Sequence, residues 1–163
     1  MTGCTVREES RLDHSAIAAV THAAFGGRQV EVEMIDAIRN CDEYVPGLSL
    51  VADIDGDVVG HCMLGRKHLA ARPAPAVLAL GPLSVHPRWQ RQGVGGRLVT
   101  AALKAALRRG QEDLIVLLGE PTYYPRFGFK PASDFGIGPD WPAAMVFPLV
   151  DDISVYRGTA IPH

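Results

Sequence analysis

The chain has 163 residues, of which 47% are hydrophobic and 21% charged, and its formal net charge is −2. These values are typical of a single globular domain over residues 1–163, and the scattered basic residues argue against a nucleic-acid-binding protein. The sequence has no apolar stretch near the roughly 20 residues of a membrane span, and residues 1–14 lack the apolar core of a signal peptide. We therefore expect a cytoplasmic protein without a membrane partner.

The cysteines and histidines do not indicate a metal centre. The cysteines are odd in number and far apart, which fits reduced thiols better than a disulfide framework or a zinc site; they are Cys4, Cys41 and Cys62. The histidines lack the spacing of metal ligands, so we expect no bound metal.

The first forty residues predict a short strand and then two helices. Residues 5–7 are a candidate strand, and Asp13 suits the N-cap of a helix that ends at Gly26-Gly27. The apolar residues of this first helix are Ile17, Val20, Ala24 and Phe25. A second helix is expected over residues 30–40, and its apolar side is formed by Val30, Met34, Ala37 and Ile38.

The second predicted helix also carries three acidic residues, Glu31, Glu33 and Asp36. They could face a cationic amine. Charged runs on helices are usually solvated faces, however, and this is the interpretation we favour.

A β-hairpin is predicted over residues 48–64, because Asp55-Gly56-Asp57 separates two runs rich in β-forming residues. His61 and Cys62 are adjacent in its second strand and therefore point to opposite faces. We expect Cys62 to pack in the core and His61 to face outward or line a groove. Residues 66–75 follow as a loop that contains two prolines.

The central stretch, residues 76–109, predicts a strand, a polar turn and an amphipathic helix. Gly81-Pro82 interrupts the strand before it ends at Val85, and the helix begins at Val94 after a glycine-rich turn. A helix start preceded by glycine exposes unpaired N–H groups and partial positive charge, which suits a phosphate or pyrophosphate. Arg88 and Arg91 add positive charge to the same turn. The alternatives are a plain polar turn or a different nucleotide site.

The last third of the chain predicts two strands separated by loops. Residues 113–118 read as a buried strand, and Pro121 and Pro125 limit any helix after it to about one turn. A further strand or turn begins near Phe129, and residues 134–141 are predicted to be a loop. Residues 144–150 form a last strand, which Pro148 favours at a sheet edge where a second chain could pair, giving a possible homodimer.

Two sequence motifs, one in the central stretch and one after it, together resemble those of the GNAT acetyltransferase superfamily. The first is QRQGVG over residues 90–95, which follows LSVHP at the end of the central strand, and the second is GEPTYYPRFGF over residues 119–129. The resemblance covers nearly the whole chain and is greatest to a bacterial branch with Y-Y-x-R-F-G-F. It implies an α/β (mixed α+β) fold with a central mixed, mostly antiparallel sheet flanked by helices, and acetyl-CoA as cosubstrate.

The resemblance also implies how the cosubstrate is held. The CoA pyrophosphate would lie on the backbone amides of the turn and first helical turn, namely Arg91, Gln92, Gly93, Val94, Gly95 and Gly96. The pantetheine arm would pair with the main chain of Leu83, Ser84 and Val85, and a backbone N–H there could polarise the thioester carbonyl.

For catalysis, the resemblance points to Tyr124 as the acid that protonates the departing thiolate. Alternatively, Tyr124 is structural. The base is less defined, because Ala79 stands where some members carry a glutamate. Glu120 is the candidate base; a water chain or an acceptor that arrives neutral are the alternatives.

We therefore predict an acetyl-CoA-dependent N-acetyltransferase that acts on a primary amine of a small molecule or peptide, by direct attack in a ternary complex. The alternative is a non-catalytic acyl-CoA-binding or regulatory module of the same fold. A third possibility is transfer to a hydroxyl group or from a longer acyl donor.

Overall fold

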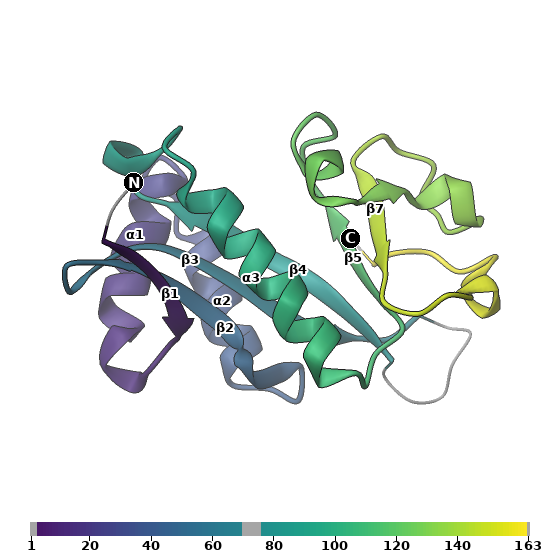
Figure 1. The fold of residues 1–163 in the computed structure, drawn as a ribbon, viewed down its shortest axis with the longest axis horizontal. Helices are drawn as coiled ribbons and strands as arrows, with labels where there is room; N and C mark the ends of the chain where they lie inside the picture. The colour runs from purple at the N-terminus through teal and green to yellow at the C-terminus, as the bar shows by residue number, and fades with distance from the viewer. Residues whose placement is uncertain (1–2, 70–75, 163) are drawn as a thin grey trace. The chain divides into compact units, whose positions relative to one another are not determined.

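The computed structural model describes residues 3–69 and 76–162, and in this part of the chain the strands form a seven-stranded sheet in the order β1-β2-β3-β4-β5-β7-β6 (Figure 1). The strands are β1 (Cys4–Glu8), β2 (Tyr44–Ile54), β3 (Asp57–Lys67), β4 (Val77–Val85), β5 (Leu114–Leu118), β6 (Lys130–Pro131) and β7 (Ala144–Pro148). The α-helices are α1 (His14–Ala24), α2 (Val30–Arg39) and α3 (Val94–Arg109). Short 3-10 turns are η1 (Arg11–Asp13), η2 (Pro87–Trp89), η3 (Tyr124–Phe127), η4 (Ala132–Phe135) and η5 (Ser154–Tyr156).

Strand β4 pairs with β5 in parallel, whereas β1–β2, β2–β3, β5–β7 and β6–β7 are antiparallel. The predicted mixed, mostly antiparallel sheet flanked by helices is therefore confirmed. No helix within the described residues has the length and apolar character needed to span a bilayer.

The chain groups into two compact units. The first contains residues 3–65 and 81–105, and the second contains residues 66–69, 76–80 and 106–162. Strand β4 and helix α3 each contribute residues to both units. Of the loop predicted over residues 66–75, residues 66 and 67 belong to β3, and residues 70–75 lie outside the described residues.

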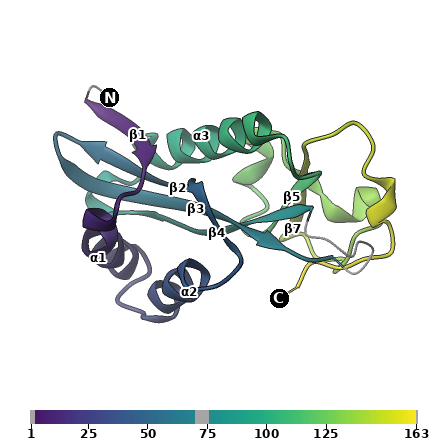
Figure 2. The same cartoon turned by 90° about the horizontal axis from the view of Figure 1, so that it is seen from below.

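In the first unit, helices cover both faces of the strands (Figure 2). Helices α1 and α2 lie on one face, where Ile17 and Ile35 form a buried cluster with Val51 and Met63. Helix α3 lies on the opposite face and packs closely against β3. An added Cβ at Gly60 would come within 2.9 Å of the Leu98 side chain, so this contact requires glycine.

The predicted hairpin is confirmed as β2–β3. Ile54 pairs with Asp57, and the two residues between them, Asp55 and Gly56, have φ angles of 52° and 90°. Positive φ at both central residues is the signature of a type I′ turn, whose twist matches that of the flanking strands.

The apolar side predicted for helix α2 is only partly the side that it buries, because Ile38 packs against the buried cluster but Ala37 is exposed. Ile35 is buried, whereas Val30 is 57% exposed and Met34 is 45% exposed. An ion pair also joins α2 to the segment after β1. Arg39 lies one helical turn after Ile35 and binds the buried carboxylate of Glu9 through two hydrogen bonds of 3.0 and 2.9 Å.

Glu9 is the centre of a buried polar cluster beneath α1 and α2. Its carboxylate accepts hydrogen bonds from Ser49 at 2.6 Å and Tyr44 at 3.1 Å, and it lies 3.3 Å from Nε2 of His14. Burial alone would raise the pKa of Glu9, but hydrogen bonds from His61, Arg39 and Ser49 hold it well below its ordinary value. The carboxylate is therefore charged at neutral pH.

The expectation that His61 faces outward or lines a groove was wrong. Its side chain is fully buried, and Nε2 lies 2.9 Å from the Ser49 hydroxyl. Burial lowers the pKa of His61, which keeps the imidazole neutral near pH 7. The adjacent Cys62 is buried, as predicted, and burial raises the pKa of its thiol to about 12, so it is an inert core residue.

The N-cap prediction for Asp13 also needs correction. The first helix begins at His14, but the side chain of Asp13 does not cap it. Its carboxylate instead accepts the N–H of Ser10 at 2.7 Å and two hydrogen bonds from Arg7 at 2.8 and 3.0 Å. The carboxylate of Asp13 therefore binds Arg7 and Ser10 and does not cap helix α1.

In the second unit, β5 lies between the start of β4 and β7. The β4–β5 pairs run from Val77–Leu114 to Ala79–Val116. Strand β7 was predicted at a sheet edge but is the second strand from it, because Lys130 and Pro131 of β6 pair with Val146 and Met145. This removes the paired part of β7 from the edge on which a homodimer was expected.

The segment after β7 folds back on the second unit, which the sequence did not predict. Ile153, Tyr156 and Ile161 are buried in the same cluster as residues of β5 and β7. The Tyr156 hydroxyl donates a 2.7 Å hydrogen bond to Asp113, the residue before β5. The end of the chain therefore contributes to the core of this unit.

Candidate active site

The first candidate site is the turn that leads from β4 into α3, in the first unit. Arg91 and Gly93 both have left-handed backbones, with φ of 62° and 87°. An added Cβ at Gly93 would meet no atom within 4 Å, so the backbone conformation, and not crowding by the protein, favours glycine there. A left-handed arginine is uncommon, and such outliers cluster at ligand-binding sites.

The start of α3 presents its free N–H groups from this turn. The carbonyl of Gly93 accepts the N–H of Arg97 at 3.1 Å. The N–H groups of Val94, Gly95 and Gly96 precede it and have no acceptor within the helix. Together with residues 91–93, they form what we call the cradle (residues 91–96). The positive end of the helix dipole and the exposed Arg88 and Arg91 favour an anion there.

Two glutamine side chains brace the turn. Nε2 of Gln90 donates to the carbonyl of Val85 at 2.9 Å, and Nε2 of Gln92 donates to the carbonyl of Arg88 at 3.1 Å. The side chain of Gln92 thus holds the protein's own backbone, and only its main chain belongs to the cradle. Gln90 belongs to the same motif, but it was not among the residues predicted to bind the cosubstrate.

The end of β4 carries the residues predicted to bind pantetheine. Ser84 is buried and its hydroxyl donates to Thr21 of α1 at 3.3 Å, whereas Leu83 and Val85 are half-buried. Ser84 therefore offers main-chain groups and not its hydroxyl. The N–H of His86, the next residue, donates to Val59 of β3 at 2.8 Å.

The second candidate group, Glu120 and Tyr124, lies in the second unit. Tyr124 is 9% exposed, and its ring packs edge-on against Tyr123 and Phe129 at centroid distances of 5.1 and 5.7 Å. Glu120 is exposed, and its carboxylate accepts hydrogen bonds from the N–H and hydroxyl of Thr122 at 3.2 and 3.0 Å. The N–H of Tyr124 lies 3.5 Å from the Glu120 carbonyl, so one turn holds both residues.

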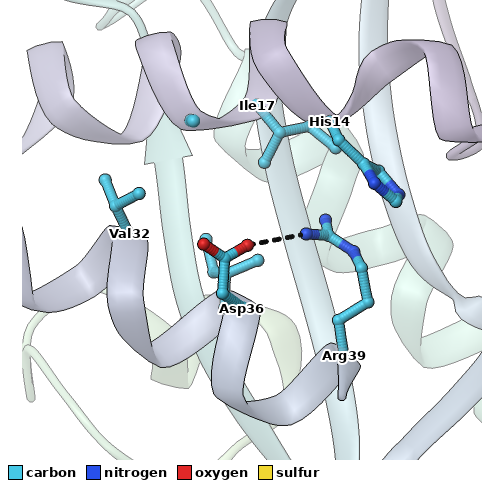
Figure 3. A pocket seen from close by; sticks show the side chains of 7 residues that line it. His14, Ile17, Val32, Asp36 and Arg39 are labelled. Atoms are coloured by element: carbon cyan, nitrogen blue, oxygen red, sulfur yellow. Dashed lines mark hydrogen bonds and ion pairs between the residues drawn. The ribbon is translucent and has the colours of Figure 1, made fainter.

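A small pocket lies between α1 and α2 (Figure 3). Its volume is about 10 Å³, which is room for about one water molecule. Asp36 lines it and pairs with Arg39 at 3.2 Å, while Glu31 pairs with Arg28 at 2.8 Å. Glu31 and Asp36 therefore have cationic partners, and the Asp36 side chain is 67% exposed whereas that of Glu31 is 14% exposed.

The model of the acetyltransferase (GNAT) family matches residues 16–129. This chain belongs to the GNAT acetyltransferase family. Membership of an acetyltransferase family supports an enzyme over a non-catalytic module.

Relatives in this GNAT family resemble the chain over most of its length. The uncharacterized N-acetyltransferase YjhQ of Escherichia coli strain K12 is 36% identical over 132 residues, which are 80% of this chain and 72% of YjhQ. The crystal structure of the GNAT N-acetyltransferase YhbS of Escherichia coli in complex with CoA has a TM-score of 0.83 and 26% identity, covering 96% of this chain and 86% of YhbS. A GNAT acetyltransferase from Brucella melitensis in complex with acetyl-CoA has a TM-score of 0.76 and 33% identity, covering 92% of this chain and 90% of that one.

Proposed function

We propose that this protein transfers the acetyl group of acetyl-CoA to a primary amine of a small molecule or peptide, by direct attack in a ternary complex. The observation that carries the proposal is the cradle: two left-handed residues, Arg91 and Gly93, turn the chain into a helix whose first N–H groups have no acceptor within the helix. The bound CoA and acetyl-CoA in the YhbS and Brucella structures support the same cosubstrate here.

In this proposal the CoA pyrophosphate lies on the amides of residues 91–96, and Arg88 and Arg91 neutralise part of its charge. The pantetheine amides pair with the main chain of Leu83–Val85. These residues lie beyond the stretch Val77–Ala79 over which the described residues of β4 pair with β5. Their main-chain groups are therefore not used by that ladder.

The chemistry requires a bond change and two proton transfers. The amine nitrogen attacks the thioester carbonyl, whose developing oxyanion accepts a hydrogen bond from a backbone N–H near Leu83–Val85. The C–S bond then breaks and the amide forms. Tyr124 donates a proton to the leaving thiolate, and Glu120 accepts the proton that the amine loses.

The activity test measures thiol release from acetyl-CoA with a panel of amines, polyamines, amino acids and peptides. We expect release that depends on one class of acceptor. CoA binding without release from any acceptor would favour the non-catalytic module, and absence of both would refute the proposal.

The cradle can be tested with Gly93→Ala. An alanine at φ 87° is strained, and relieving that strain would move the amides of the cradle, so we expect CoA affinity to fall about tenfold. Gly158→Ala is the matched control, because Gly158 has φ 89°, has open space around its missing Cβ and lies in the second unit. Isothermal titration of both variants separates a local effect from general strain; equal affinities would contradict the assignment.

A further inference from the structure

His86 connects three elements just before the cradle. Its N–H donates to the Val59 carbonyl of β3 at 2.8 Å, and its carbonyl accepts the N–H of Trp89 at 2.8 Å. Its side chain caps the turn η2, because Nδ1 accepts the N–H of Arg88 at 3.1 Å. The following residue, Pro87, has no N–H, so this cap satisfies the first donor of the turn.

The cap works in only one protonation state. Nδ1 can accept a hydrogen bond only while it carries no proton, since both nitrogens of a charged imidazole are donors. A proton on Nδ1 would face the N–H of Arg88 and break the bond. Histidine is the side chain whose charge ordinarily changes between pH 5 and 8.

We infer that His86 is a positioning residue for the cradle: its unprotonated Nδ1 holds the turn, and protonation loosens it and weakens CoA binding. This inference rests on the proposed function. The route from cap to cradle is short, because the carbonyl of Arg88, whose N–H binds His86, is also the acceptor for the side chain of Gln92. Loss of the cap therefore releases the N–H of Arg88, the same residue whose carbonyl accepts the hydrogen bond from Gln92.

His86 lies near both acidic and basic side chains. It lines an open groove of about 460 Å³ with residues of η1, α1 and the β2–β3 turn, and the charged ones are Asp13 and Asp57. Asp13 pairs with Arg7 at 2.8 Å, whereas Asp57 is exposed. Arg88 and Arg91 lie in the same turn as His86, and α1 contributes Ala16, Ala19 and Val20 to the groove. The groove gives solvent protons access to the ring.

The test replaces His86 by a residue that can accept the same hydrogen bond but has no ionisable group. In His86→Asn the side-chain oxygen can still accept the N–H of Arg88, as asparagine does at many caps. We would measure the Kd for CoA of the wild type and the variant at about pH 8 and about pH 5.5, which bracket histidine titration. Titration of CoA itself and of the other histidines affects both proteins equally, so it cancels in the ratio of the two Kd values.

We expect the ratio of wild-type Kd to variant Kd to rise about fivefold from the higher to the lower pH, as for the loss of one hydrogen bond. A ratio that does not change would overturn the inference. His86→Ala, which removes the cap at every pH, should bind CoA more weakly than His86→Asn at both pH values.

A second readout does not require CoA. In the Trp141→Phe background, Trp89 is the remaining tryptophan. Its backbone N–H donates to the His86 carbonyl, so the residue is attached directly to the cap. We expect its emission maximum to shift between the two pH values, and the shift to vanish when His86→Asn is added. The same shift in both proteins would overturn the inference. Absence of CoA binding by both at the higher pH would refute the proposed function instead, and the Trp89 result would still decide the role of His86.

Discussion

Tyr124 depends on a glycine for its position. An added Cβ at Gly119 would lie 2.7 Å from the Tyr124 ring, closer than atoms can approach without a shift. The ring therefore fills the space that a side chain at Gly119 would need. A tyrosine held this tightly keeps a defined orientation, which a proton donor requires.

If Tyr124 is the acid, Tyr124→Phe should lower kcat about a hundredfold and leave the Kd for CoA unchanged, because the phenol acts only on the leaving thiolate. Tyr123→Phe is the matched control. Its ring contacts Tyr124 and Arg126, but no proton transfer is assigned to it. Steady-state kinetics and calorimetry check both values, and unchanged kcat in Tyr124→Phe would remove Tyr124 from the mechanism.

Asp13 leads to a prediction about acid stability. The hydrogen bonds from Arg7 lower the pKa of Asp13 from 3.8 to about 2, against the opposing effect of burial. A carboxylate with a lowered pKa stabilises the fold above its unfolded pKa, and this contribution is lost as pH falls through the folded value. Between about pH 5 and pH 2, urea unfolding should show the wild type losing about 2 kcal/mol more than Asp13→Asn. Equal losses would contradict the role of the Arg7 pair.

At this scale the sequence predicted backbone features better than side-chain partners. The glycine motif correctly indicated a turn into a helix, because φ preferences are local. The role of Gln90 could not be predicted, since its partner is a carbonyl five residues earlier that comes into reach only when the turn has folded. The burial of His61 had no local signal either, because Glu9 and Ser49 are distant in the sequence.

Among the elements, α2 packs on the first unit through Ile35 and Ile38 and is also held by a buried ion pair. The Arg39–Glu9 pair is buried and joins residues thirty positions apart. Glu9→Gln removes the buried one of the two charged partners of Arg39, so we expect the free energy of unfolding to fall by about 3 kcal/mol. The control is Asp36→Asn, which removes the exposed partner of the same arginine and should change it by about 0.5 kcal/mol or less. Chemical denaturation measures both, and similar losses would show that the buried pair is not what anchors α2.

The elements predicted correctly are those with local signals. The hairpin follows from Asp55-Gly56, and the buried β5 from its continuous apolar run. Strand β7 was misplaced because its outer neighbour, β6, has only two residues and includes a proline, so nothing in the sequence marks it as a strand. Pairing partners of this length are determined by tertiary packing.

For the whole molecule, we propose that the two units form a single cooperative domain. Strand β4 and helix α3 each supply residues to both units, so neither unit contains all of its elements alone. The two tryptophans report on them separately, since Trp89 belongs to the first unit and Trp141 to the second. Thermal unfolding of Trp141→Phe and Trp89→Phe, followed by fluorescence and far-UV circular dichroism, should give coincident fluorescence and dichroism midpoints in each variant. Separate midpoints would show that the units unfold independently.

The overall architecture was predictable because the order of helices and strands is typical of a mixed α/β protein and because two motifs, at residues 90–95 and 119–129, indicate the family. Composition and periodicity indicated a mixed α/β protein, and the motifs indicated the family. The nature of the acceptor was not predictable, because it depends on side chains brought together by the fold. The ion pairs of the α2 acids are different, since Arg28–Glu31 and Asp36–Arg39 have the i,i+3 spacing that a sequence shows directly.

The glutamine braces of the cradle have a kinetic consequence. Because Gln90 and Gln92 hold the turn through bonds within the chain, the conformational entropy of the turn is lost during folding and not when CoA arrives. A preorganised turn needs no slow closing step. If CoA binds the cradle as proposed, association is then limited by the orientation of the encounter and by attraction between the arginines and the phosphates. The association rate constant should in that case not be lowered by the time needed to order the turn.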